Sequence, residues 1–150
     1  MNEISYQQAV IKLMSATVKK EASDLHLCAG YPPIIRVNDS LWAIPGEQKL
    51  SASDSQGMAF ALMTEEQRQQ FLKNKEIDFS YSFINEERFR VNVFYQKGFV
   101  SAALRLIPKK IRSLNELNLP LALNHLIEAT QGFVMITGPS SHGKSTTLAA

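Results

Sequence analysis

The chain has 150 residues, of which 45% are hydrophobic and 20% are charged, a composition typical of a folded globular protein. Its 16 basic and 14 acidic residues leave a net charge of +2, which gives no electrostatic reason to expect a nucleic-acid partner. A single cysteine, Cys28, excludes an internal disulfide, and no apolar stretch approaches the roughly 20 residues that cross a bilayer. These features predict a cytoplasmic protein.

The first segment of the chain predicts a helix followed by two short strands. Residues 4–20 carry apolar side chains at mostly helical spacing, which predicts an amphipathic helix. Residues 24–27 alternate polar and apolar side chains, as a half-buried strand does. A second strand is expected after Pro33, ending at the turn Asn38–Asp39. His26, in the first of these strands, is interpreted as a structural rather than a catalytic histidine.

Residues 51–73 return to a helical pattern that two start signals divide. Ser51 precedes Asp54 by three residues, and Thr64 precedes Gln67 by three. Both pairs fit a capping box, in which the first side chain and the fourth satisfy each other's backbone amides. We therefore expect two short helices in succession.

Strict alternation then predicts an antiparallel meander of three strands. Phe79, Tyr81 and Phe83 share one face of the first strand, and a second apolar stripe runs from Phe89 to Tyr95. A turn at Lys97–Gly98 leads into a third strand over residues 99–106. With one face buried under the helices, residues 1–106 are expected to form an α+β domain.

Residues 107–114, which include basic side chains, are interpreted as a linker to a second segment, residues 115–150. Another capping box, Ser113 with Glu116, and a helix over residues 121–130 are expected in this part of the chain. The apolar run 133–137 (Phe-Val-Met-Ile-Thr) predicts a buried strand.

That strand leads into a phosphate-binding loop of the Walker A type. Gly138 is followed after four residues by Gly143, Lys144 and Ser145, which satisfies the P-loop pattern. Glycines let consecutive amides turn toward a phosphate, the lysine reaches the β- and γ-phosphates, and the serine hydroxyl binds Mg²⁺. The residues assigned to nucleotide binding are Gly138, Pro139, Ser140, Ser141, His142, Gly143, Lys144, Ser145 and Thr146.

Several segments together resemble the PilT family, the retraction ATPases of type IV pili within the larger class of secretion ATPases. They occur in the order and spacing of that family over nearly the whole chain. The segments are ASDLHL (22–27), PPIIRV (32–37), RFRVNVFYQ (88–96), ALRLIP (103–108) and GPSSHGKSTTLAA (138–150).

The resemblance implies a hexameric motor that binds ATP and Mg²⁺ and drives pilus retraction and twitching motility. Each subunit of the family has a PAS-like N-terminal domain, a linker and a RecA-like ATPase domain. The ring acts on the inner-membrane platform of the pilus, at its cytoplasmic face. The family's arginines of the FRVN and LRxIP segments correspond to Arg90 and Arg105, which the resemblance assigns to the nucleotide; Arg88 is a weaker candidate.

The loop departs from the family's usual form, GPTGSGKST, at two positions. His142 fills a variable place and is not interpreted as catalytic or metal-binding. Ser141 replaces a glycine that often takes a positive φ, which serine adopts only at a cost. We therefore expect retained but weakened nucleotide binding, which the substitution Ser141→Gly tightens.

Groups needed for hydrolysis are not found after the loop, where no Asp or Glu follows Glu128. The family's carboxylates that hold Mg²⁺ and orient the nucleophile come later in its sequences. The chain is therefore interpreted as the N-terminal portion of a motor subunit, with residues 115–150 only partly ordered and without hydrolytic competence alone. The alternatives are an extension or type II secretion ATPase, a PilU-type rather than a PilT-type protein, and a non-hydrolysing fragment that binds nucleotide or subunits.

Overall fold

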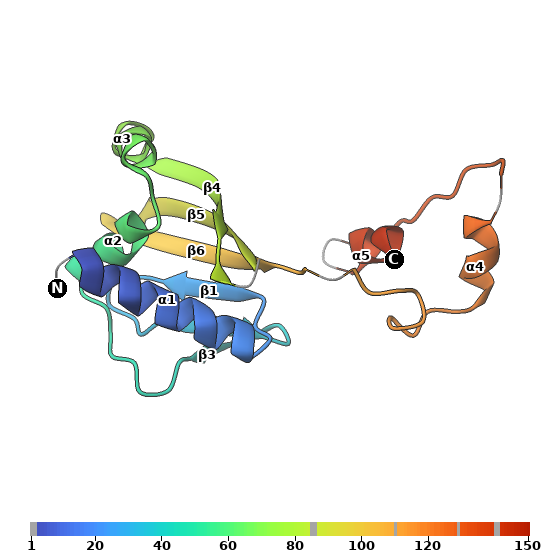
Figure 1. The fold of residues 1–150 in the computed structure, drawn as a ribbon, viewed down its shortest axis with the longest axis horizontal. Helices are drawn as coiled ribbons and strands as arrows, with labels where there is room; N and C mark the ends of the chain where they lie inside the picture. The colour runs from blue at the N-terminus through green and yellow to red at the C-terminus, as the bar shows by residue number, and fades with distance from the viewer. Residues whose placement is uncertain (1–2, 85–86, 110, 129, 140–141) are drawn as a thin grey trace. The chain divides into compact units, whose positions relative to one another are not determined.

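The computed structural model describes residues 3–84, 87–109, 111–128, 130–139 and 142–150. It divides into two compact units, Met1–Ile107 and Pro108–Ala150 (Figure 1). The first unit contains a sheet covered by helices, whereas the second contains two short helices and long irregular segments.

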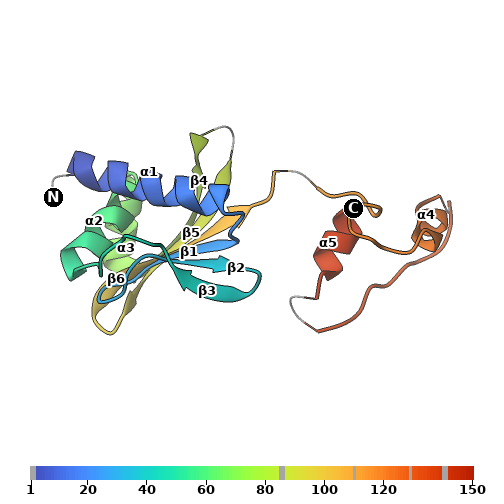
Figure 2. The same cartoon turned by 90° about the horizontal axis from the view of Figure 1, so that it is seen from below.

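The first unit is an α+β domain built on one antiparallel sheet of six strands in the order β3-β2-β1-β6-β5-β4. Helix α1 runs across β1, α2 packs on β6, and α3 lies beside β4 (Figures 1 and 2). Its elements in chain order are α1 (Glu3–Lys19), β1 (Asp24–Leu27), β2 (Ile34–Val37), β3 (Ser40–Ala43), α2 (Ala52–Ala61), α3 (Glu65–Asn74), β4 (Glu76–Ser82), β5 (Arg88–Gln96) and β6 (Phe99–Ile107).

Both predicted capping boxes in this unit are confirmed. The side chain of Ser51 accepts a hydrogen bond from the amide of Asp54, and the amide of Ser51 donates one to the carboxylate of Asp54. Thr64 and Gln67 make the same pair of hydrogen bonds at the start of α3. Each box satisfies amides that the first turn of a helix leaves without partners. The segment is therefore two helices rather than one.

The meander of β4, β5 and β6 is also confirmed, and a further strand was missed. At the turn between β5 and β6, Lys97 and Gly98 both have positive φ angles, 52° and 83°. Asn38 and Asp39 repeat this pattern with φ angles of 46° and 62°, so the Asn38–Asp39 turn joins β2 to β3 in a hairpin instead of ending the sheet. All four residues of β3 are exposed, so no alternation of buried side chains marks the strand in the sequence.

The core lies between the helices and one face of the sheet. Large side chains from α1, α3 and the central strands are fully buried there, among them Met14, Phe71, Phe89 and Leu104. Gly57 in α2 lies against the ring of Tyr6, so close that a Cβ at position 57 would collide with that ring. The opposite face of the sheet carries the polar and charged residues of the same strands together with apolar side chains such as Ile34 and Phe94.

The second unit contains α4 (Ala122–Ile127) and α5 (Lys144–Ala149). The capping box of Ser113 and Glu116 forms, but it closes a turn rather than starting a helix. The strand expected at 133–137 is wrong, because the described residues of this unit offer it no neighbouring strand. Phe133 and Met135 accordingly remain 84% and 69% exposed.

Within the described ranges, no helix combines the length and the apolar character that crossing a membrane requires.

Candidate functional site

Arg90 lies on the polar face of β5 and is held from the side by Asp78 of β4. Its Nε donates to Oδ1 at 3.1 Å, and its Nη2 donates to Oδ2 at 2.6 Å, so the contact uses one edge of the guanidinium. The arginine side chain is 68% exposed. Hydrogen bonds from Arg90 hold the pKa of Asp78 below its ordinary value, so this carboxylate stays charged in mild acid.

Asp24 is a buried carboxylate between two arginines of the neighbouring strands. Arg105 of β6 donates from Nε to Oδ1 at 2.9 Å, and Nε of Arg36 of β2 lies 3.3 Å from Oδ2. Ser23 also donates its hydroxyl to Oδ2 at 2.8 Å. Burial by itself raises the pKa of Asp24, but the hydrogen bonds from Arg105 and Ser23 outweigh it and leave the pKa below its ordinary value.

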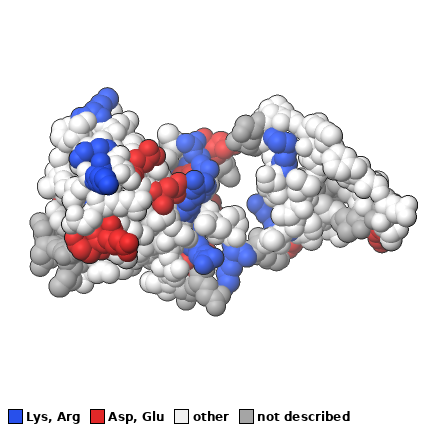
Figure 3. All heavy atoms as spheres, turned by 90° about the horizontal axis from the view of Figure 1, so that it is seen from above, with Lys and Arg blue, Asp and Glu red and all other residues white. Residues whose placement is uncertain are grey.

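The strand register places these charges in one row across the sheet. Arg36, Asp24, Arg105 and Arg90 are consecutive cross-strand partners on β2, β1, β6 and β5. Two guanidiniums are thus direct neighbours, Arg105 and Arg90, and each is drawn toward a carboxylate on its far side. In the face shown in Figure 3, basic and acidic atoms lie next to one another, without one large field of either sign.

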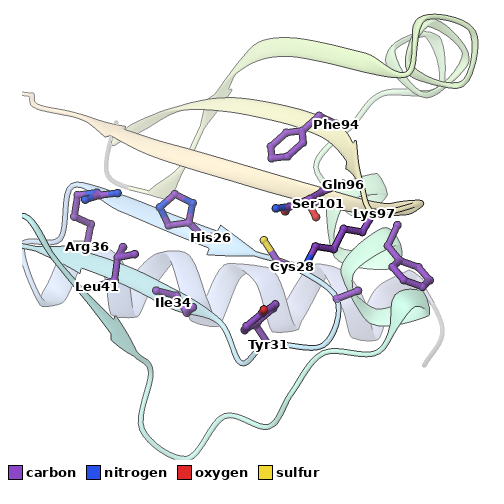
Figure 4. Close-up of a pocket in the computed structure, with 12 residues that line it drawn as sticks. His26, Cys28, Tyr31, Ile34, Arg36, Leu41, Phe94, Gln96, Lys97 and Ser101 are labelled. Carbon is purple, nitrogen blue, oxygen red and sulfur yellow. The ribbon is translucent and has the colours of Figure 1, made fainter.

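A shallow depression of about 270 Å³ lies between the two arginines, with Asp24, Asp78 and Asn92 also at its wall. A second, larger hollow of about 480 Å³ lies on the polar face of the sheet, and Figure 4 shows aromatic and basic side chains around it. His26 lines both hollows. The smaller hollow is lined by Arg90 and Arg105, and the larger one by Arg36 and Lys97.

His26 differs from the satisfied structural histidine that the sequence suggests. Its Nε2 is buried and has no hydrogen-bond partner among the described residues. Burial lowers the pKa of His26, the charge of Asp24 opposes this, and Arg36 and Arg105 add to the lowering. The imidazole is therefore held in its neutral form.

The loop predicted to bind phosphate lies in the second unit and leads into α5. Gly143, at the start of α5, has φ 79°, a left-handed conformation that favours glycine, and Gly138 has φ 150°. Lys144 turns back over the loop, where its Nζ donates to the carbonyl oxygens of Gly138 and Pro139. Ser145 follows on the first turn of α5 with its side chain exposed.

These features fit a triphosphate with its magnesium ion. Lysine Nζ already lies over the loop that would surround the β- and γ-phosphates, and both glycines have open space where a Cβ would project. Ser145, whose hydroxyl is the group predicted to bind Mg²⁺, and Thr146 follow Lys144 on α5. In the described part of the chain, no cluster of three or more Asp, Glu, His or Cys forms a separate metal site.

Not every assigned loop residue is described. Ser140 and Ser141 lie outside the described residues, so the expectation of strain at Ser141 stays a prediction. His142 is described and exposed. Arg90 and Arg105 belong to the first unit and the loop belongs to the second.

Sequence reasoning found the arginines but missed their carboxylate partners. Arg105 in an apolar strand required a partner, yet its identity depended on pairing β1 with β6, two strands that are 81 residues apart at this contact. The alternation along β4 places Asp78 on the same face of that strand as Ser80, which is the cross-strand partner of Arg90. The signal that could have identified these partners is the alternation of polar and apolar residues, which places Asp24 on the polar face of β1.

Comparisons with known proteins identify the class. The chain is 37% identical to the type IV pilus retraction ATPase PilT of Pseudomonas aeruginosa over 141 residues, which cover 94% of this chain and 41% of that protein. It is 38% identical to the type IV pilus ATPase PilU of the same organism over 139 residues, covering 93% of this chain and 36% of PilU. These relatives are ATPases of the type IV pilus machinery.

A solved structure of the pilus retraction motor PilT with bound ADP matches the fold, with a TM-score of 0.76 and 36% identity. The match covers 93% of this chain and 40% of that one. The chain belongs to the PilT family and spans about two fifths of the length of the PilT relative. A scan against models of known protein families finds no match.

Proposed function

We propose that this chain is the nucleotide-binding part of a type IV pilus motor ATPase. Its loop, from Gly138 to Thr146, binds the phosphates of ATP and the accompanying Mg²⁺. Arg90 and Arg105 contribute to hydrolysis by stabilising the charge that develops on the γ-phosphate. Arginine suits this role because its planar group donates paired hydrogen bonds and stays charged.

The observation that carries this proposal is the match to pilus ATPases along nearly the whole chain. The ADP reported with the solved PilT structure adds support, since that protein is 36% identical to this chain over the matched part. The position of Lys144 over its own loop agrees with a phosphate-binding role.

The further properties proposed for the whole protein follow from the family. They are assembly into a homo-hexamer, an N-terminal PAS-like domain with a RecA-like domain after the linker at 107–114, and work on the pilus platform protein at the cytoplasmic face of the inner membrane. Retraction is proposed in preference to extension. Because PilT and PilU are equally similar to the chain, at 37% and 38% identity, the choice between these two types is left to experiment.

Direct measurement of ATP–Mg²⁺ binding tests the proposal. In the full-length protein that carries this sequence, Lys144→Ala should weaken ATP binding about 10- to 100-fold, since a hydrogen bond to a charged group is worth about 1.5–3 kcal/mol. Lys73→Ala, which removes an exposed lysine of α3, is the matched control and should bind like the wild type.

The outcomes separate two kinds of protein. ATP binding that depends on Lys144, together with Mg²⁺-dependent turnover, supports the motor. ATP binding without turnover in the full-length protein would instead indicate a non-hydrolysing nucleotide- or subunit-binding module. No binding of ATP–Mg²⁺ at all would contradict the proposed function.

A further inference from the structure

The contact between Asp24 and Arg105 joins a buried carboxylate to an exposed arginine. The side chain of Asp24 is 9% exposed, whereas that of Arg105 is 71% exposed. They lie directly opposite each other on β1 and β6, the two central strands of the sheet. Arg105 is therefore held through one edge of its guanidinium by a residue of a central strand, while most of its side chain is exposed.

The geometry of the contact leaves the outer end of Arg105 available. Its Nε donates to Asp24, and no other nitrogen of Arg105 meets an acceptor among the described residues. Because Nε accounts for one of the five N–H donors of a guanidinium, the two Nη groups keep the other four for an anion. Arg90 is held differently, since Asp78 takes both its Nε and one Nη.

The carboxylate is itself held in place from several sides. Ser23 donates to Oδ2, and Arg36 approaches the same oxygen from the opposite strand. A buried ion pair is weak evidence for stability, because apolar side chains of similar size often stabilise a fold as well or better. An aspartate fixed in this way is better suited to orient Arg105 than to strengthen the sheet.

The neighbouring arginine makes such an anchor necessary. Arg90 and Arg105 are cross-strand partners, and like charges directly opposite each other repel. Asp24 draws one guanidinium toward β1, and Asp78 draws the other toward β4. The depression of about 270 Å³ lies between them, lined by both arginines.

We propose that Asp24 is a positioning residue for ATP hydrolysis, which holds Arg105 through Nε and thereby keeps its Nη groups available to the transferred phosphoryl group. This inference rests on the proposed function and assigns to Asp24 a role that acts only through Arg105. It predicts that loss of the carboxylate affects turnover more than ATP binding.

The test measures steady-state ATP turnover of the full-length protein with Asp24→Asn. The amide is similar in size but lacks the charge that fixes Arg105, so kcat should fall about 10- to 100-fold while KM for ATP stays near the wild-type value. Adding Asp24→Asn to Arg105→Ala should cause no further loss, because the aspartate has then nothing to position.

Two further variants keep the test decisive. Arg36→Ala removes one of the contacts that hold Asp24 but leaves the bond from Arg105 to Asp24 in place, so it should lower kcat less than Asp24→Asn does, at unchanged KM. Should Asp24→Asn fail to fold, Ser23→Ala removes one hydrogen bond to the carboxylate and should lower kcat slightly at unchanged KM.

The outcomes test this inference and the proposed function separately. A wild-type protein that does not turn over ATP overturns the proposed function, and the role of Asp24 with it. An active wild type in which the losses from Asp24→Asn and Arg105→Ala add fully overturns the positioning role alone. The same follows if Asp24→Asn raises KM and leaves kcat unchanged.

Discussion

The two units of the chain differ in how completely they satisfy their own backbone and side chains. In the described residues of Met1–Ile107, six paired strands and three helices enclose a continuous core, and charged side chains on one face of the sheet form cross-strand ion pairs. In Pro108–Ala150, Leu114 is the one buried hydrophobic side chain among the described residues. Its apolar residues instead surround a small hollow of about 190 Å³.

This difference places the stable core in the first unit and the loop proposed to bind nucleotide in the second. The arginines proposed to act on phosphate are fixed on a rigid sheet, whereas the loop proposed to hold the phosphates follows an apolar segment without strand partners. Segments that bind ligands often come from the less stable parts of a protein. We expect the first unit to fold independently and the second to gain protection when nucleotide binds.

The largest expected effect comes from the core of the first unit. Phe89→Ala removes a fully buried ring and should lower the free energy of unfolding by about 3–5 kcal/mol. Phe133→Ala in the second unit removes a ring that is 84% exposed and should change it by less than about 0.5 kcal/mol. Urea unfolding followed by circular dichroism measures both, and equal losses would remove the contrast between the units.

Hydrogen exchange compares the units without mutation. Amides of β5 such as those of Val91 and Val93, which lie in buried positions, should exchange only by global or near-global unfolding. Amides of residues 134–136 should exchange rapidly in the isolated chain. Strong protection of 134–136 in the monomer would show that the second unit is ordered by contacts of its own.

The capping boxes of the two units allow the same comparison of stability with a smaller expected effect. Ser51→Ala, at the start of α2, should cost about 1 kcal/mol of unfolding free energy, because it leaves a helix amide without its partner. Ser113→Ala breaks the same arrangement in the second unit, where it closes only a turn, and the main unfolding transition should not move. Thermal unfolding of both variants measures the difference.

The smallest expected effect is the loss of unfolding free energy at low pH that depends on Asp24. The pKa of Asp24 is lowered in the folded chain, so its contribution to stability is present above its ordinary pKa of 3.8 and is lost as the pH falls through the lower, folded pKa. Asp78 acts in the same direction. Urea titrations near pH 7 and near pH 3 should therefore show a smaller acid loss for Asp24→Asn than for the wild type; an equal loss would contradict the shift.

Local patterns predicted much of the first unit, because its signals are local. Each capping box needs residues only three apart, and the alternation of Phe89 to Tyr95 identifies the buried face of β5 without knowledge of the other strands. The sequence did not predict the hairpin from β2 into β3, because all four residues of β3 are exposed. The apolar run at 133–137 has the composition of a buried strand, but a strand needs a neighbour to pair with.

The candidate site was predicted in part for a related reason. Gly138, Gly143 and Lys144 belong to one short sequence pattern, and the places of Gly143 and Lys144 at the start of α5 follow from it. The partnership of Asp24 with Arg105 depends on strand pairing over a long sequence separation, which alternation does not specify. The unpartnered Nε2 of His26 likewise follows from packing and not from its neighbours in sequence.

The central claim is the proposed function, in which Arg105 contributes to the hydrolysis of ATP. The most direct test compares ATP affinity and turnover of the full-length protein with Arg105→Ala, using Arg112→Ala in the linker as control. We predict that Arg105→Ala lowers kcat by on the order of 10³-fold and changes ATP affinity little, as loss of a transition-state contact does. Equal losses of affinity and turnover, or no loss of either, would contradict the account.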